Sequence, residues 1–103
     1  NKTKYFEANV YKFKNKYLLI KNKKFNFLKN LVIFPMNEIN RKKFKYSDQK
    51  KINVKMSNMN MKILINKNNK VKKTRDSLFL DKTNIKKYIL PSFTKKIFYS
   101  ASH

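Results

Sequence analysis

The chain contains no glycine in 103 residues, and this absence limits how its backbone can turn. Glycine is the usual residue where the backbone needs the left-handed conformation, and asparagine is the next best choice. Asparagine is abundant, so we expect it at tight turns, among them Asn15-Lys16, Asn22-Lys23-Lys24 and the stretch 66–69. Glycine-rich loops that cradle phosphates are excluded in their usual form.

The stretch from Met61 to Pro91 has the most complete local pattern. Met61 to Ile65 is a short apolar run that is partly β-branched, and the residues after it, 66–69, are turn-forming. The residues from Lys70 to Thr74 can return as a second strand. This order predicts a β-hairpin.

Two short helices are predicted after the hairpin. Thr74 is a suitable N-cap for the first helix and Leu78 would lead its apolar face, while Pro91 would end the second. The second helix would carry Ile85, Tyr88 and Ile89 at helical spacing. The expected fold class is therefore small α+β, a β-hairpin followed by two short helices.

Apolar and basic residues interleave in the N-terminal third, over residues 5–34. Alternation with the strand period of two is visible in Tyr11 to Lys14 and in Phe25 to Phe27, with the apolar run Tyr17 to Ile20 between them. We expect either a three-stranded meander or an extended basic arm whose aromatic side chains dock into a larger assembly. Pro35 marks a connection. The predicted organisation is an N-terminal extension over 1–36, a hairpin and helix module over 37–91, and a C-terminal tail over 92–103.

The net charge of +22 sets the class of partner. It arises from 27 lysines and arginines against five acidic residues, and a small isolated domain would be destabilised by that repulsion. Nucleic acid is the expected partner, because each neutralised phosphate releases counterions. Only Arg41 and Arg75 are arginine, so we expect binding to shape and backbone with little reading of sequence. An aromatic content of 15% predicts a chain that orders.

Catalytic and metal-binding chemistry is not expected. The five acidic residues are scattered, the single histidine is the last residue, and cysteine is absent, so neither a nucleophile with its base nor a thiolate zinc site is indicated. We predict a protein that is not an enzyme and takes no cofactor. The longest apolar run, Leu31 to Met36, is far shorter than a membrane span.

Residues 74–90 read Thr-Arg-Asp-Ser-Leu-Phe-Leu-Asp-Lys-Thr-Asn-Ile-Lys-Lys-Tyr-Ile-Leu. With two one-residue gaps, this segment resembles the C-terminal signature of the bacterial-type large-subunit ribosomal protein family twenty-eight in its organellar form. Lys50 to Val54 is similar to a basic stretch upstream in that family, and Asn37 can be placed on its Gly-Asn-Asn. A second alignment lays 54–66 on the same signature. The missing glycines depart from the family pattern at the turns.

The resemblance implies a structural component of an organellar, mitochondrial ribosome large subunit that binds and stabilises rRNA. Its module over 37–91 would lie on rRNA, beside neighbouring ribosomal proteins, in the mitochondrial matrix, with the plastid as the second choice of compartment. No small-molecule substrate and no membrane insertion are expected. Phe93, Ile97, Phe98 and Tyr99 would meet rRNA or a neighbouring protein, since a short tail cannot bury them alone.

The stretch from Asn40 to Lys55 is the most basic and least periodic part of the chain. Its lysines are expected on phosphates, and Phe44 and Tyr46 would either stack on exposed bases or tuck into the local core. The predicted RNA-binding residues are Arg41, Lys42, Lys43, Lys45, Lys50, Lys51, Asn53, Lys55, Lys62, Lys67, Lys70, Lys72, Lys73, Arg75 and Lys82.

Two alternatives stay open at this point. One is an organelle-specific ribosomal protein of either subunit, which would share the function without the family. The other is a small basic subunit of a membrane-bound complex that lies on anionic lipid, which would require an amphipathic helix with a large apolar face.

Overall fold

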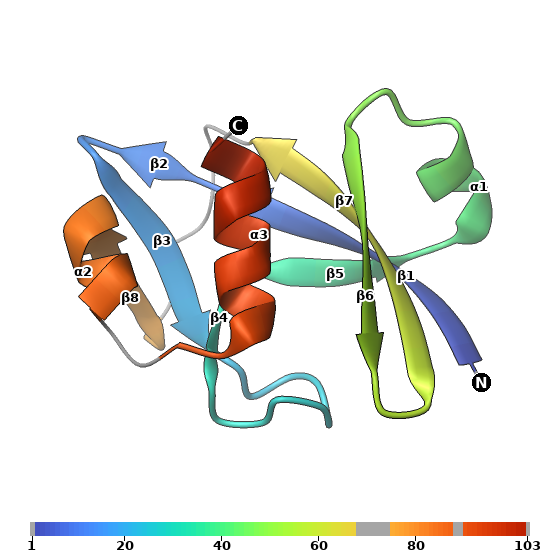
Figure 1. The fold of residues 1–103 in the computed structure, drawn as a ribbon, viewed down its shortest axis with the longest axis horizontal. Helices are drawn as coiled ribbons and strands as arrows, with labels where there is room; N and C mark the ends of the chain where they lie inside the picture. The colour runs from blue at the N-terminus through green and yellow to red at the C-terminus, as the bar shows by residue number, and fades with distance from the viewer. Residues whose placement is uncertain (1, 68–74, 88–89, 103) are drawn as a thin grey trace.

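The computed structural model describes residues 2–67, 75–87 and 90–102. They form a small α+β fold of two four-stranded sheets and three helices, which confirms the expected fold class (Figure 1). The strands are β1 (Lys2–Val10), β2 (Lys12–Phe13), β3 (Lys16–Lys21), β4 (Val32–Ile33), β5 (Met36–Ile39), β6 (Lys50–Met56), β7 (Met59–Lys67) and β8 (Ser77–Asp81). The helices are α1 (Arg41–Lys45), α2 (Lys82–Lys87) and α3 (Ser92–Ser102).

The first sheet has the strand order β5-β1-β7-β6. Its centre is a parallel pair in which β1 runs beside β7 over nine residues, while β5 and β6 add antiparallel strands at the two edges. The sequence of β1 alternates, so that Phe6, Ala8 and Val10 point to the core and Tyr5 and Glu7 point away from it. The N-terminal residues are therefore integral to the sheet and do not form an arm.

The second sheet is built around β3. Tyr17 pairs with both Lys12 and Leu80, and Ile20 pairs with both Ile33 and Ser77. Because a strand has two edges, β8 lies along one edge of β3, and β2 and β4 share the other.

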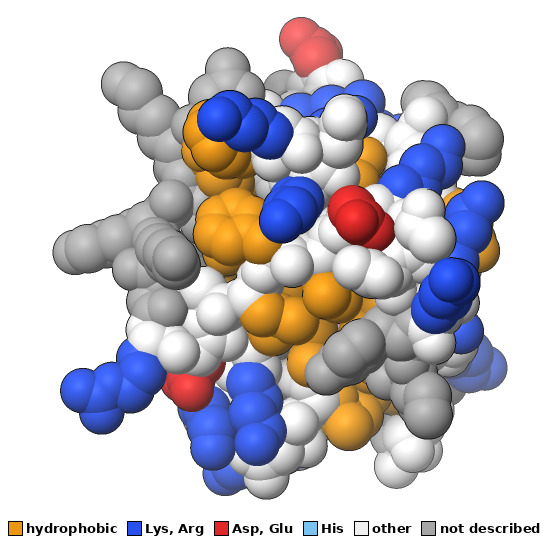
Figure 2. Space-filling view, turned by 90° about the vertical axis from the view of Figure 1, so that its left-hand side faces the viewer, with side chains coloured by type: hydrophobic (Ala, Val, Ile, Leu, Met, Phe, Trp, Pro, Cys, Tyr) orange, Lys and Arg blue, Asp and Glu red, His pale blue; other side chains and the backbone are white. Residues whose placement is uncertain are grey.

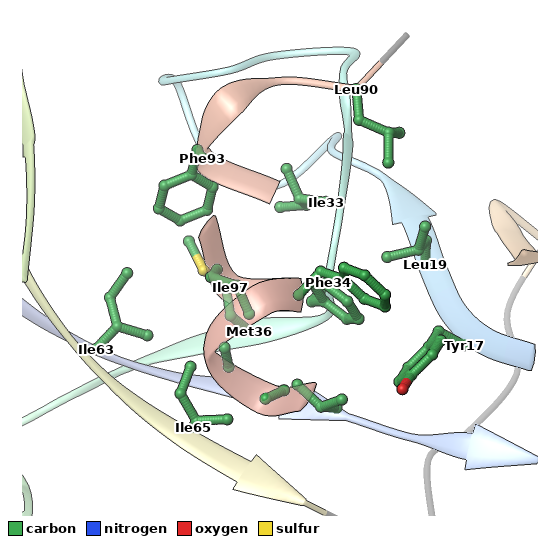
Figure 3. Packing of buried hydrophobic residues seen from close by; sticks show 14 of the residues in the cluster. Tyr17, Leu19, Ile33, Phe34, Met36, Ile63, Ile65, Leu90, Phe93 and Ile97 are labelled. Carbon is green, nitrogen blue, oxygen red and sulfur yellow. The ribbon is translucent and has the colours of Figure 1, made fainter. Parts of the chain in front are cut away.

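Helix α3 packs between the two sheets and completes the core (Figure 3). Phe93, Ile97 and Phe98 are buried, and the Phe98 ring meets the ring of Tyr17 edge-on at 5.1 Å between centroids. The buried Thr94 hydroxyl donates a hydrogen bond of 2.6 Å to the carbonyl of Val32. The expectation that the aromatic residues of a C-terminal tail need an outside partner is thus wrong for Phe93 and Phe98.

All three predicted segments contribute to one hydrophobic core. Phe6 and Leu19 come from 1–36, Ile63 comes from 37–91, and Ile97 comes from 92–103. In Figure 3 these segments surround α3 from several sides. A core shared in this way makes the described residues a single folded unit.

The first predicted helix is replaced by a strand. Ser77–Asp81 pairs antiparallel with β3, and its alternation places Leu80 in the core. The predicted N-cap, Thr74, lies outside the described residues. Helix α2 begins after Asp81, whose carboxylate accepts a 2.7 Å hydrogen bond from the backbone N–H of Asn84. Strand pairing with β3 overrides the local helical pattern here.

The hairpin that the structure shows lies one element earlier than the predicted one. Strand β7 pairs with the preceding β6 through a two-residue turn at Ser57 and Asn58, and its other edge is occupied by β1. Ser57 has a φ of 49°, as the first central residue of a type II′ turn requires. The predicted return strand, 70–74, lies outside the described residues.

The turns show how a chain without glycine reaches the left-handed region. The β2–β3 turn has Lys14 and Asn15 at φ 48° and 66°, the two positive values of a type I′ hairpin, one residue earlier than expected. Leu28 and Asn30 are also positive, at 51° and 66°. Asparagine therefore occupies two of the five positive-φ positions in the described residues.

Asn22 organises the loop between β3 and β4. Its side chain is 1% exposed, and its amide nitrogen donates to the carbonyls of Phe27 and Leu28 at 2.7 and 3.1 Å. Its amide oxygen accepts from the backbone N–H groups of Lys24 and Phe25 at 3.2 and 3.0 Å.

The predicted third meander strand is wrong, because Phe25 to Phe27 belongs to the loop that Asn22 organises. Both rings pack edge-on against Phe6.

Replacing Asn22 with alanine is expected to lower the free energy of unfolding by about 3 kcal/mol, because several buried backbone groups lose their partner at once. Urea denaturation followed by circular dichroism measures the change. Asn26→Ala is the matched control, since Asn26 is exposed in the same loop and should change stability by less than about 0.5 kcal/mol. Equal effects of the two substitutions would contradict this role of Asn22.

Candidate nucleic-acid interface

The first sheet has one face that α3 leaves uncovered. We call it the outer face, and it carries the side chains that alternate with the core residues of β1, β7 and β6. The register brings Tyr5, Lys62 and Asn53 into one row across three strands, next to the row of Thr3, Asn60 and Lys55. The outer face is therefore mostly polar and basic, with the buried Leu64 between Glu7 and Lys51, whereas the inner face is mostly apolar.

Helix α1 stands at one end of the outer face. Its N-cap is Asn40, whose side chain accepts a 2.7 Å hydrogen bond from the N–H of Lys43. The Phe44 ring packs on Tyr5 with 5.2 Å between centroids. Helix and sheet enclose a hollow of about 370 Å³, which we call the α1 pocket. Its lining consists of Tyr5, Arg41, Phe44, Lys45, Lys51 and Lys62.

The aromatic rings at α1 hold lysines near them. The Lys51 ammonium lies 5.3 Å from the centroid of the Phe44 ring and donates a 3.2 Å hydrogen bond to the carbonyl of Lys45. The Lys45 ammonium lies 5.8 Å from the Tyr46 ring, which is 72% exposed. Phe44 is thus partly covered by its neighbours, while Tyr46 presents its ring to solvent.

A second hollow of about 410 Å³ adjoins the α1 pocket and shares Lys62 with it. Thr3, Asn53, Lys55 and Asn60 contribute hydroxyl, amide and ammonium groups to its lining. Lys96 reaches it from α3 and donates a 2.7 Å hydrogen bond to the carbonyl of Asn53. The two hollows together form a continuous run of hydrogen-bond donors that matches phosphate and sugar oxygens.

Negative charge is scarce at this surface. Glu7 is the only acidic residue in β1, β6, β7 and α1. Its carboxylate lies 3.5 Å from the Lys43 ammonium, the one ion pair in the described part of the chain. The cations of Arg41, Lys45 and Lys51 have no acidic partner among the residues described, so the outer face attracts polyanions.

The predicted RNA-binding residues separate into groups. Six of them lie together on the outer face or the rim of α1: Arg41, Lys45, Lys51, Asn53, Lys55 and Lys62. Lys42 is exposed on α1, Lys43 pairs with Glu7, and the Lys50 ammonium donates to the carbonyl of Ser100.

The remaining predicted residues lie elsewhere. Lys67 ends β7, Arg75 is exposed before β8, and Lys82 begins α2. Lys70, Lys72 and Lys73 lie outside the described residues. Sequence reasoning missed Thr3, Tyr5 and Asn60 as members of the surface. The period-two alternation of β1 is the signal that identifies the first two.

Comparisons with known proteins show the fold alone. No family model matches the chain, and no curated protein matches it. Among solved structures, it is similar to the C-terminal domain of mouse MUTYH, determined in complex with human PCNA, with a TM-score of 0.62. The sequence identity is 12%, and the match covers 96% of this chain and 87% of that one. At this identity, the likeness concerns the arrangement of strands and helices.

The described residues contain no group of three or more histidine, cysteine, aspartate or glutamate side chains placed to hold a metal ion. None of their helices combines the length and the apolar character needed to cross a membrane.

Replacing Glu7 with glutamine is expected to raise the affinity for RNA about twofold to threefold at low salt, because it removes the acidic group from the outer face and frees Lys43. Fluorescence anisotropy with a mixed-sequence RNA hairpin measures the affinity. Glu38→Gln gives the same change in net charge from β5, where Glu38 is exposed and paired opposite Phe6. An equal gain from both variants would show that only net charge matters.

Proposed function

We propose that this protein is a structural, non-catalytic RNA-binding component of an organellar ribosome, most specifically of the mitochondrial large subunit. The observation that carries the proposal is the outer face, where four cationic side chains surround the Tyr5 and Phe44 rings and one acidic residue is present. The resemblance of 74–90 to ribosomal protein family twenty-eight supports the choice of assembly. The surface supports the proposal more directly than the fold does, since one fold can host many functions.

The outer face suits binding to the RNA backbone. Lysine ammonium groups act as point charges toward phosphates, and each phosphate that they neutralise releases counterions. The amides of Asn53 and Asn60 and the hydroxyl of Thr3 can bond to sugar and phosphate oxygens. Tyr46, exposed beside Lys45, offers a ring on which an unpaired base can stack. This combination favours recognition of RNA shape over sequence.

The same observations favour RNA over a lipid surface. A protein that lies on anionic lipid needs an amphipathic helix with an exposed apolar face. Helix α3 is the longest helix of the described residues, and its apolar side chains Phe93, Ile97 and Phe98 are buried in the core. Helices α1 and α2 have five and six residues. The basic surface is a polar sheet face, which has no apolar side to insert.

Replacing both Lys51 and Lys62 with alanine is expected to weaken binding to a mixed-sequence RNA hairpin about tenfold, because two phosphate contacts are lost. For the same reason, the slope of log K against log salt concentration should become shallower by about 1.4–2. Fluorescence anisotropy over a salt series measures both quantities.

Lys23→Ala with Lys29→Ala is the matched control, because both lysines are exposed on the loop that Asn22 organises. The control variant has the same net charge and should bind the RNA hairpin nearly as well as the unaltered chain. Equal weakening in the two double variants would overturn the assignment of the outer face.

The tagged chain is expected to sediment with large ribosomal subunits on a sucrose gradient at moderate salt and to be released as soluble protein at high salt, since its attachment is electrostatic. Mitochondrial lysates analysed by immunoblotting provide the measurement. Sedimentation with small subunits would favour an organelle-specific protein outside family twenty-eight. Sedimentation with membranes after ribosomes have been dissociated would contradict the ribosomal proposal.

A further inference from the structure

The β2–β3 hairpin carries an exposed aromatic side chain far from the outer face. Phe13 is 52% exposed at the end of β2, next to the turn formed by Lys14 and Asn15. In Figure 1 this hairpin and α1 lie at opposite ends of the long axis of the molecule, which measures 35 Å. A single exposed apolar ring is common on protein surfaces, so what indicates a ligand is how this ring is held and which charges lie beside it.

The local structure holds the Phe13 ring in a defined position. The type I′ turn fixes Phe13 opposite Lys16 in the hairpin. The Tyr11 ring lies parallel to the Phe13 ring, at an interplanar angle of 6° and with 6.5 Å between centroids. Tyr11 in turn meets Phe79 of β8 at 6.5 Å. The exposed ring is therefore supported from one side and is preorganised for contact on the other.

Positive charge lies beside this ring. The Lys14 ammonium lies 5.5 Å from the Phe13 centroid, and Lys16, which pairs with Phe13, is exposed. Lys12 instead pairs with Tyr17, and its ammonium lies 5.7 Å from the centroid of that ring. Figure 2 views this end of the molecule and shows lysine and arginine side chains around exposed apolar ones. The nearest acidic residue in register is Asp81, opposite Lys16, and its carboxylate caps α2.

The hairpin repeats an arrangement found at α1. Tyr46 and Phe13 are the two most exposed aromatic side chains among the described residues, and each has the ammonium of an adjacent lysine within 6 Å of its ring. Tyr99, the next most exposed aromatic residue at 48%, has no such lysine contact in the described part of the chain. The two ends of the molecule therefore share one arrangement, an exposed aromatic ring with a lysine ammonium beside it.

We propose that the β2–β3 hairpin is a second RNA-binding surface, on which an unpaired base stacks on Phe13 while Lys14 and Lys16 contact flanking phosphates. Together with the outer face, it lets one chain bridge two RNA segments. This inference rests on the proposed function. A protein partner fits less well, because lysine is depleted in the cores of protein interfaces, whereas stacking beside cations is the usual mode of single-stranded RNA binding.

A bridging assay tests the proposal. An immobilised RNA hairpin is incubated with the protein, and capture of a second, fluorescent single-stranded RNA carrying aminopurine is recorded. The unaltered chain should capture the second RNA, and stacking should quench aminopurine fluorescence. Phe13→Ala is expected to reduce capture about tenfold and to abolish the quenching, because one stacked base is lost. Phe13→Tyr should keep both signals, because an aromatic ring remains.

The controls separate this inference from the proposed function. Tyr99→Ala removes another exposed aromatic side chain and should leave capture and quenching unchanged. Lys51→Ala with Lys62→Ala should weaken the first RNA contact and leave the quenching at the hairpin. Capture that is undiminished in Phe13→Ala, with RNA binding still dependent on Lys51 and Lys62, would overturn the second surface alone. Absence of RNA binding by the unaltered chain would overturn both proposals.

Discussion

The burial of α3 between the two sheets is the interaction on which the rest of the structure depends. Phe93, Ile97 and Phe98 supply the apolar layer that covers the inner face of the first sheet and one side of the second. Because that layer is complete, the opposite face of the first sheet needs no cover and can be polar. The Lys96 ammonium of α3 donates a hydrogen bond to the edge strand β6, and the Lys50 ammonium of β6 donates one to α3. These two bonds also protect an edge that would otherwise be open to pairing.

The distribution of charge follows from the same arrangement. With a core this small, nearly every cation must lie at the surface, and the described residues hold one ion pair in a chain whose net charge is +22. Lysines near the rings of Phe13, Tyr46 and Phe44 combine cation–π contact with access to solvent. A polyanion bound at these positions would relieve repulsion within the folded state, so RNA binding and stability are coupled in the proposed function.

Local pattern predicted the chemistry of the surface better than the topology. The fold class was predictable, and Arg41, Lys45 and Lys51 were expected at an interface because the stretch around α1 is basic and interrupted by aromatics. Lys62 was expected there as one of the lysines of the predicted hairpin. The strand Ser77–Asp81 was not predictable from its own residues, since Leu78 also suits the apolar face of a short helix. Pairing with the edge of β3 determines that this segment is a strand. The role of Asn22 was equally hidden, because a buried amide that makes five hydrogen bonds to four residues of one loop looks like any turn asparagine in sequence.

The parallel pairing of β1 with β7 has a kinetic consequence. It joins residues 2–10 to residues 59–67, and the core is closed only when α3, at 92–102, has packed between the sheets. Contacts between such distant segments are slow to form, because the loop between them must first be closed. During synthesis, the apolar sides of β1 and β3 therefore remain exposed to solvent until α3 has been made. The high positive charge keeps such incomplete chains apart from one another in that interval.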